Sequence, residues 1–347
     1  MELAVTELRG HLVDIHLPLL GAGCYSRPMI VALFGASGKI GRRTIQLLQK
    51  SGVEIRALIH RTPLPESLSG GVETVCGSVS DAGVVDALVD GADIVLQMAT
   101  AKEDPATFFD VSIRGTFEIL EACRRHRPRQ FLLLGGDAAK GIWFYPRPEP
   151  IRETDPAVAY PGNYAFSKVM EETMAGQYHH QYGLGTTILR SSWVFDGDDL
   201  LNHFSLLANV DPSEPGHGFG HVSEDVLALV RDGKEHIPIL LDAHGNPLTR
   251  HVVHIDDVMQ GLERMIGNPD AFGEDFNIAA PAPFDYRTAA ELLSEKLGLP
   301  TIELPCPDYH GFSIDISKAR NILGYAPEND FSKMVDRAIA ARAEAAD

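Results

Sequence analysis

The amino-acid sequence predicts a doubly wound α/β fold, in which a parallel sheet is covered by helices on both faces. Three observations lead to this prediction: short runs of continuously apolar residues, helix-like segments between them, and a glycine-rich turn directly after the first run. A strand whose apolar residues are continuous rather than alternating is buried on both faces, which is typical of parallel sheets.

The predicted elements alternate along the chain in a regular order. Apolar runs predict strands at 29–34, 54–59, 72–76, 92–98, 132–134 and 186–190. Helical spacing of apolar residues predicts connecting helices from about residue 40, at about 107–126 and at 161–182. A strand–helix pattern at 251–265, a strand at 276–279, a helix at 288–297 and a final helix from about 331 complete the order.

Two segments depart from this alternation. Residues 1–28 show no sustained period and precede a second methionine, so we expect an N-terminal extension of unknown role or an upstream start codon. Residues 193–250 are rich in Asp, Gly, His and Pro, which is typical of a loop-rich substrate region. We therefore expect a nucleotide domain at 29–192 and 251–279, and a small discontinuous substrate-binding cap at 193–250 and 280–347.

Composition excludes several classes of function. The chain has 347 residues, and its 48 acidic against 30 basic residues give a net charge of −18. Nucleic acids and anionic membranes need a basic surface, so neither is an expected partner. The four cysteines form no C-x-x-C pair, and no apolar run approaches the ~20 residues of a membrane span. We expect a cytoplasmic protein that acts on a small molecule.

The turn after the first strand reads Gly35-Ala-Ser37-Gly38-Lys39-Ile40-Gly41. Glycines at this spacing allow a tight turn, close approach of the backbone to a pyrophosphate and close packing of helix on strand. The N-terminus of the following helix then offers unpaired N–H groups to the anion. The turn predicts a dinucleotide site, and its residues are candidate cofactor contacts.

The end of the second strand bears on the choice of cofactor. NAD sites normally place an acid about 20 residues after the glycines, where it binds the ribose 2′-hydroxyl. Here the corresponding residues are His60 and Arg61, and Arg42 directly follows the last glycine. Guanidinium groups match a 2′-phosphate, so NADP is favoured and NAD remains possible. The alternative is that these arginines are simply exposed surface residues.

Tyr164 and Lys168 are four residues apart, on one face of the helix predicted at 161–182. A phenol with an ordinary pKa of about 10 is a poor acid–base group at neutral pH. A nearby ammonium favours the phenolate and lowers that pKa. The pair, placed after the glycine turn and a series of strand–helix units, predicts an acid–base centre.

At this point the sequence resembles the extended short-chain dehydrogenase/reductase family, the group that holds the NAD-dependent epimerase/dehydratases. The resemblance runs from Met29 to about residue 340. Its stretches are the turn at 35–41, residues 111–122, Tyr164 to Lys168, Leu189-Arg190, 254–258, 276–278 and 317–324 with Tyr325 and Pro327.

The resemblance implies a Rossmann-type fold and roles for particular residues. Tyr164 would be the acid–base residue, and Lys168 would also bind the nicotinamide ribose. Further cofactor contacts would come from Ser78, Val79, Met98, Ala99, Thr100, Ser112 and Arg190. The family often dimerises through the two long helices, so a homodimer is expected.

Three positions depart from the family pattern. The usual Ser or Thr near the end of the fifth strand is Gly136 here, and the neighbouring Asp137 either binds a substrate hydroxyl in its place or caps a turn. The family's helical Asn is Ser112, and the acid that often binds adenine is Ser78, with Asp81 nearby. The catalytic residues carried forward are Tyr164, Lys168 and Asp137.

The predicted function is NAD(P)-dependent hydride transfer at a hydroxyl or keto carbon of a sugar-like substrate, by an epimerase, dehydratase or dehydrogenase. Trp193 and Phe195 are candidate substrate contacts. An NADP-dependent ketone reductase would be favoured if Trp193, Phe195 and Phe204 formed a dry pocket. A non-catalytic NADP-binding regulator is a further alternative, because the serine at Gly136 is missing.

Histidine pairs are the remaining candidates for metal ligands. They lie at 217 and 221 and at 251 and 254, but neither pair has the H-E-x-x-H pattern or an obvious carboxylate partner. We therefore expect no metal.

Overall fold

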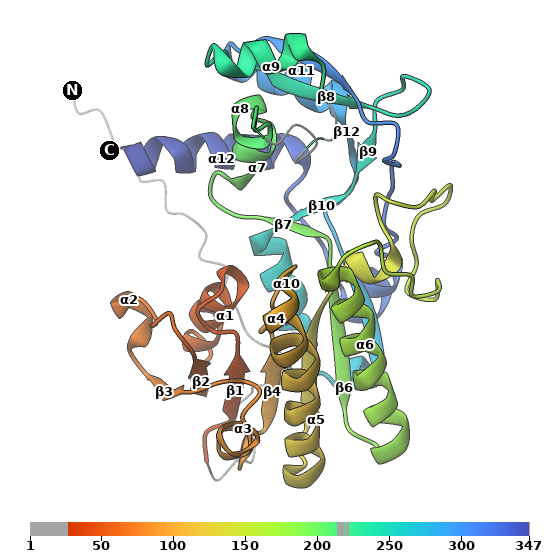
Figure 1. The fold of residues 1–347 in the computed structure, drawn as a ribbon. Coiled ribbons are helices and arrows are strands. Elements are labelled where there is room, and N and C mark those ends of the chain that lie inside the picture. Colours follow the sequence, from red (N-terminus) through yellow and green to blue (C-terminus); the bar gives the residue numbers. More distant parts are fainter. Residues whose placement is uncertain (1–26, 214–218, 220–221, 347) are drawn as a thin grey trace, which may run out of the picture.

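The computed structural model describes residues 27–213, 219 and 222–346. Figure 1 shows a sheet flanked by helices in the lower part of the molecule and a smaller body above it. The predicted extension, residues 1–28, lies outside the described residues except for its last two positions. Within the described part, no helix is long and apolar enough to cross a membrane.

A seven-stranded sheet forms the centre of the lower body, in the order β11-β6-β5-β4-β1-β2-β3. All of its strand pairs are parallel. The strands are β1 (Ile30–Phe34), β2 (Glu54–Ile59), β3 (Val72–Cys76), β4 (Ile94–Gln97), β5 (Gln130–Gly136), β6 (Thr186–Ser191) and β11 (Glu274–Ile278). Because β1 lies between β2 and β4, the chain winds outward from it in two directions. The predicted doubly wound fold is confirmed.

Helices cover both faces of this sheet. Helices α1 (Lys39–Gln49) and α10 (Ile255–Met265) contact one another and pack into one apolar core. Helices α3 (Ala82–Val89), α5 (Gly115–His126) and α6 (Asn163–Tyr182) pack into the core on the opposite face. The short α2 (Glu66–Ser69) precedes β3.

The helix predicted at about 107–126 is interrupted. It consists of α4 (Pro105–Phe108), a π-helical segment (Phe109–Arg114) and α5.

Residues 193–250 were predicted to be rich in loops, but they contain several helices and strands of the upper body. Its β8 (Ile237–Leu241) pairs in parallel with β13 (Thr301–Pro305), and α9 (Glu224–Arg231) begins at a Ser223 cap. The other helices are α7 (Asp199–His203), α8 (Leu206–Asn209), α11 (Tyr286–Leu297) and α12 (Phe331–Ala346). All five residues of β8 are buried, so its apolar run marks a real strand.

Two short strand pairs lie above the central sheet. β7 (Trp193–Phe195) pairs in parallel with β10 (Val252–His254), and β9 (Thr249–Arg250) pairs antiparallel with β12 (Phe284–Asp285). The strand predicted near residue 251 therefore joins β7 and not the central sheet. The β7–β10 pair lies between the two bodies, whereas β9 and β12 lie near β8 in the upper body (Figure 1).

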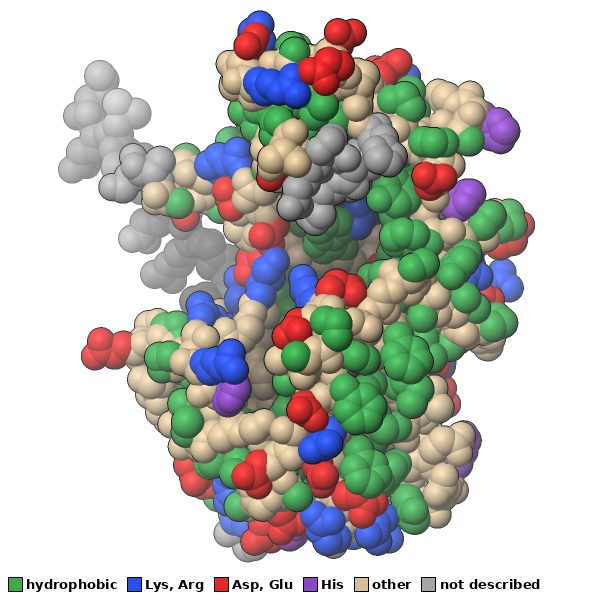
Figure 2. All heavy atoms as spheres, in the orientation of Figure 1, with side chains coloured by type: hydrophobic (Ala, Val, Ile, Leu, Met, Phe, Trp, Pro, Cys, Tyr) green, Lys and Arg blue, Asp and Glu red, His purple; other side chains and the backbone are tan. Residues whose placement is uncertain are grey.

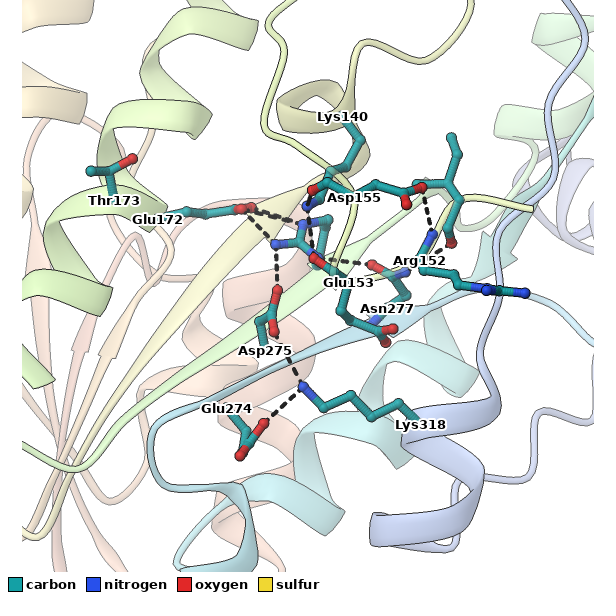
Figure 3. A network of polar contacts seen from close by, with 12 residues as sticks. Lys140, Arg152, Glu153, Asp155, Glu172, Thr173, Glu274, Asp275, Asn277 and Lys318 are labelled. Atoms are coloured by element: carbon teal, nitrogen blue, oxygen red, sulfur yellow. Dashed lines mark hydrogen bonds and ion pairs between the residues drawn. The ribbon is translucent and has the colours of Figure 1, made fainter. Parts of the chain in front are cut away.

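A buried ionic network ties α6, β6 and β11 together (Figure 3). The Arg190 guanidinium on β6 is 4% exposed and donates to Glu172 of α6 at 2.7 Å and to Asp275 of β11 at 2.8 Å. It also donates to the Asn277 side chain at 3.0 Å. Lys318 binds Glu274 at 2.8 Å and Asp275 at 3.2 Å at the more exposed end of the network.

We expect Arg190→Met to destabilise the protein strongly, because the buried Glu172 carboxylate would lose its main cation. The free energy of unfolding should fall by about 3–5 kcal/mol, measured by urea denaturation. Lys318→Met is the matched control: its ion pairs are partly exposed, so its loss should stay near 1 kcal/mol or below. Equal losses for the two variants would contradict this account.

Candidate active site

The glycine turn lies where the order of the sheet reverses, between β1 and β4. Gly35 has φ +86°, and a Cβ there would lie 2.5 Å from the Ala99 nitrogen, so only glycine fits. A Cβ on Gly41 would overlap the Gly35 carbonyl oxygen, so this glycine allows α1 to pack on the turn. No side chain caps the N-terminus of α1 at Gly38. The turn is shaped to hold an anion against backbone amides.

A cavity of about 580 Å³ runs from this turn to the upper body. Figure 2 shows the surface hollowed between the two bodies. Its lining includes predicted residues from separate parts of the sequence: Gly35, Gly38, Lys39, Ile40, Gly41, Met98, Thr100, Asp137, Tyr164, Lys168 and Trp193. The fold thus brings the predicted dinucleotide turn and the predicted acid–base pair into one cavity.

A second cavity, of about 250 Å³, lies on the other side of the turn. It is lined by the predicted residues Ser37, His60, Arg61, Ser78, Val79 and Ala99, among others, and its lining contains no Asp or Glu. Arg42 lies beside it and donates from Nε to the Ser37 carbonyl at 2.9 Å. Asp81 instead caps α3 by accepting from the Gly83 and Val84 amides.

Tyr164 and Lys168 lie near one another at the start of α6, with the Lys168 ammonium 5.8 Å from the centre of the Tyr164 ring. The ammonium is engaged elsewhere: it donates to the Leu134 carbonyl at 3.0 Å and to Glu171 Oε2 at 2.8 Å. Burial raises the pKa of Tyr164, and the charges of Asp137, Glu171 and Glu172 raise it further. Carboxylates therefore oppose the lowering of this pKa that Lys168 was expected to cause.

Gly136 and Asp137 border the phenol. A Cβ on Gly136 would lie 3.2 Å from Tyr164 Oη, so the backbone itself closes this side of the cavity. Asp137 Oδ2 accepts from the Ser192 hydroxyl at 2.9 Å. Burial raises the pKa of Asp137 to about 6, although Ser192 and Arg250 oppose the shift. Asp137 thus titrates near neutral pH in the same cavity as Tyr164.

Arg250 of β9 is a cavity residue that the sequence analysis missed. It is buried, and its guanidinium lies between two indole rings, 3.9 Å from the centre of Trp193 and 4.7 Å from that of Trp143. Its Nη1 approaches Tyr286 Oη at 3.5 Å, while its Nε has no hydrogen-bond partner in the described chain. A buried cation of this kind suits an anionic ligand.

Several predicted residues lie outside the lining of these cavities. Arg190 is held in the buried network, and Ser112 accepts from the Ala101 amide at 3.1 Å. Phe195 and Phe204 are buried in the core, while Trp193 keeps 45% of its surface exposed. The main cavity has charged groups in its lining, so the dry pocket that would favour a ketone reductase is not formed.

The histidines considered as metal ligands have other partners where they can be described. His251 accepts from the Ile314 amide at 3.0 Å and contacts the Ala280 carbonyl at 2.9 Å, and His254 caps α10. The pair at 217 and 221 lies outside the described residues.

A dinucleotide turn and a Tyr–Lys pair in one cavity, at the carboxyl edge of a parallel sheet, define a Rossmann-fold enzyme of the oxidoreductase type. The chain belongs to the NAD dependent epimerase/dehydratase family, whose family model matches residues 31–279. The resemblance to extended short-chain dehydrogenases/reductases is therefore confirmed, and the protein is an NAD-dependent enzyme of this type.

Individual relatives agree with this assignment. A dTDP-glucose 4,6-dehydratase from Streptomyces antibioticus is 27% identical over 292 residues, which cover 77% of this chain and 75% of that protein. An NAD-bound short-chain dehydrogenase/reductase superfamily protein from Agrobacterium tumefaciens has the same fold, with a TM-score of 0.79 and 22% identity. The match covers 91% of this chain and 98% of that chain. The NAD complex of UDP-glucuronic acid 4-epimerase from Bacillus cereus has a TM-score of 0.70 and 18% identity. The match covers 92% of this chain and 100% of that chain.

We expect Gly35→Ala to weaken NAD binding, because its methyl group would meet the backbone at Met98 and Ala99. The dissociation constant should rise roughly tenfold or more, which corresponds to about 1.4 kcal/mol. Gly52→Ala is the matched control, because Gly52 also has a positive φ (+68°) but open space around it. Nucleotide binding measured by fluorescence should be unchanged in Gly52→Ala; an unchanged affinity in Gly35→Ala would contradict the assignment of the turn.

Proposed function

We propose that this chain catalyses NAD(P)-dependent hydride transfer at a hydroxyl or keto carbon of a nucleotide-sugar-like substrate, with Tyr164 as the acid–base residue. The observation that carries the proposal is the single cavity that joins the glycine turn, Tyr164 and the buried Arg250. A cofactor at the turn and an anionic substrate group at Arg250 would place the reacting carbon between them, near Tyr164.

Arg250 and Trp193 support the substrate class. The guanidinium is buried, and its Nε has no hydrogen-bond partner among the described residues, so a phosphate oxygen could accept from it. The indole of Trp193 offers an apolar face to a sugar ring beside it. The relatives are named for dTDP-glucose and UDP-glucuronic acid, which are nucleotide sugars and carry a diphosphate.

A pyrophosphate fits the turn, because Gly35 and Gly41 let the backbone close tightly around it and a Cβ on Gly38 would meet only the Gly35 carbonyl oxygen, at 3.4 Å. When bound, the nicotinamide would accept or return the hydride. Tyr164 would take up the proton of a substrate hydroxyl as the hydride leaves, and would give a proton back when a carbonyl is reduced. Burial and the nearby carboxylates raise the pKa of the phenol and favour the second of these roles. Asp137 would bind a neighbouring hydroxyl or take up a second proton, which suits epimerase or dehydratase chemistry.

We also propose NADP as the favoured cofactor, with NAD as the alternative. His60 and Arg61 line the second cavity without an acid, and Arg42 lies beside it. An acid there would bind the free 2′-hydroxyl of NAD, whereas this basic group suits a 2′-phosphate.

The same proposal includes the assembly of the protein and its location. Figure 2 shows hydrophobic side chains over α5 and α6, and Phe109 of the π-helical segment, Phe117 of α5 and Phe166 of α6 are about half exposed. This face supports a homodimer. The division into a nucleotide domain and a cap is supported by the central sheet, which lies within 29–192 and 251–279, although the β7–β10 pair crosses it. The free thiols of Cys76, Cys123 and Cys306 support a reducing cytoplasm.

We expect Tyr164→Phe to bind NAD or NADP normally and to lose turnover by roughly a hundredfold or more, because the variant lacks the hydroxyl that would exchange the proton. Candidate nucleotide sugars would be incubated with cofactor and followed by nicotinamide absorbance and by product chromatography, since an epimerase gives no net absorbance change. Tyr182→Phe, at the exposed end of the same helix, is the control. Full turnover in Tyr164→Phe would refute the mechanism.

We expect Arg61→Ala to weaken NADP binding while leaving NAD binding unchanged, because only NADP carries the phosphate. The loss should be about tenfold or more, in line with ~1.5–3 kcal/mol for hydrogen bonds to a charged group. Calorimetric titration with both cofactors measures this, and the NAD affinity serves as the internal control. A parent protein that binds NAD more tightly than NADP would overturn the preference.

A further inference from the structure

His203 and Tyr286 are two buried polar residues beside Arg250, and the proposed function gives neither of them a task. His203 ends α7, and Tyr286 begins α11. Phe284 of β12 pairs with Arg250 of β9, so this strand pair brings the start of α11 close to the guanidinium. Two hydrogen bonds join the three polar side chains: His203 Nε2 lies 2.7 Å from Tyr286 Oη, and Arg250 Nη1 lies 3.5 Å from the same oxygen.

The chemistry of the three groups fixes the direction of both hydrogen bonds. A guanidinium has donors and no acceptor, so Tyr286 Oη accepts from Arg250. The single hydroxyl proton of Tyr286 then goes to His203, whose Nε2 must be unprotonated to accept it. Burial lowers the pKa of His203, and the charge of Arg250 lowers it further, so the imidazole is neutral and meets this requirement. The hydrogen bonds therefore run from Arg250 through Tyr286 to His203.

The same imidazole supports one face of the guanidinium. The His203 ring packs edge-on against Trp193, with 4.9 Å between the ring centres, and the centre of the Trp193 ring lies 3.9 Å from the Arg250 guanidinium. Trp143 lies over the same guanidinium at 4.7 Å. His203 thus contacts both Tyr286 and Trp193, the two groups that hold Arg250. The guanidinium lines the cavity in this position, and its Nε has no partner among the described residues.

We propose that His203 is a positioning residue that holds Arg250, through the Tyr286 hydroxyl, in the orientation that binds the diphosphate of a nucleotide sugar. This role rests on the proposed function, which assigns the substrate anion to Arg250. A guanidinium that is already fixed loses little conformational freedom when a ligand binds, so the affinity for the anion rises. His203 takes no part in hydride or proton transfer, and its effect is on substrate binding alone.

The test measures the binding of dTDP and of UDP, with saturating NAD present to occupy the glycine turn. Trp143 and Trp193 are the two tryptophans of the chain, and both contact Arg250, so the change in tryptophan fluorescence reports on this site. In His203→Leu, which has no acceptor for Tyr286, the dissociation constant of the tighter diphosphate should rise by about five- to tenfold. The KM for a nucleotide sugar should rise similarly, while kcat and the affinity for NAD stay within about twofold of the parent.

Three further variants separate positioning from packing. His203→Gln can offer an amide oxygen to the Tyr286 hydroxyl, so its affinity for the diphosphate should stay near that of the parent. Tyr286→Phe removes the hydroxyl and should weaken binding as much as His203→Leu does, and it also serves if His203→Leu does not fold. Tyr325→Phe is the matched control: it removes another buried tyrosine hydrogen bond, to the Ala279 carbonyl at 2.9 Å, and Tyr325 lines neither cavity, so the affinity should not change.

A double variant tests whether His203 acts through the hydroxyl. In a Tyr286→Phe background, His203→Leu should weaken diphosphate binding by clearly less than it does in the parent. An unchanged affinity in folded His203→Leu, an equal loss in His203→Gln, or an equal loss in both backgrounds would overturn the role of His203, whether or not the parent turns over a nucleotide sugar. The binding measurement needs no turnover, so a parent protein that binds the diphosphate without turning over a nucleotide sugar would refute the proposed function and leave this test intact.

Discussion

The close approach of Gly35 to the Met98–Ala99 backbone is the contact on which the rest of the site depends. At the point where the chain winds outward from β1 in two directions, the ends of β1 and β4 stay close together, and only a residue without a side chain can turn between them. The turn directs α1 under the second cavity and opens the first toward α6. Gly35 lines both cavities, and a side chain at this position would push the turn away from the Met98–Ala99 backbone.

Helix α6 contributes residues both to the main cavity and to the core beside the sheet, so it can hold reactive groups in a fixed position. Near its N-terminus, Tyr164 and Lys168 border the main cavity, and one turn later Glu171 and Glu172 are buried against β5 and β6. The same helix is thus anchored by ion pairs and contributes its reactive groups to the lining of the cavity. Because buried ion pairs are costly to break, the position of the phenol relative to the sheet is fixed by residues that never touch a ligand.

The central sheet could be predicted closely from the sequence, because short, continuous apolar runs are typical of strands that are buried on both faces of a parallel sheet. Predicted strands 54–59 and 72–76 coincide with β2 and β3. It did not show β8 and β13, since a short strand whose partner lies some sixty residues away has no local pattern that separates it from a loop. Arg250 was missed for a related reason: its neighbours Trp143 and Trp193 come from distant segments. From the sequence alone, Glu171 cannot be distinguished from a surface acid, because only the structure shows that it lies on the buried face of α6.

The net charge of −18 makes the buried cations of the site more important than their number suggests. A strongly acidic surface repels dinucleotides and nucleotide sugars at long range, although salt screens this repulsion beyond about 10 Å. The attraction of these anionic ligands must then come from cations whose charge solvent and salt do not screen. A buried cation meets this requirement. Arg250 meets it between two indoles and lines the cavity, although the Asp137 carboxylate in the same lining offsets part of its charge. Lys168 is equally buried in the same cavity, but its ammonium already donates to Glu171 and to the Leu134 carbonyl, so the attraction of a substrate anion is assigned to Arg250.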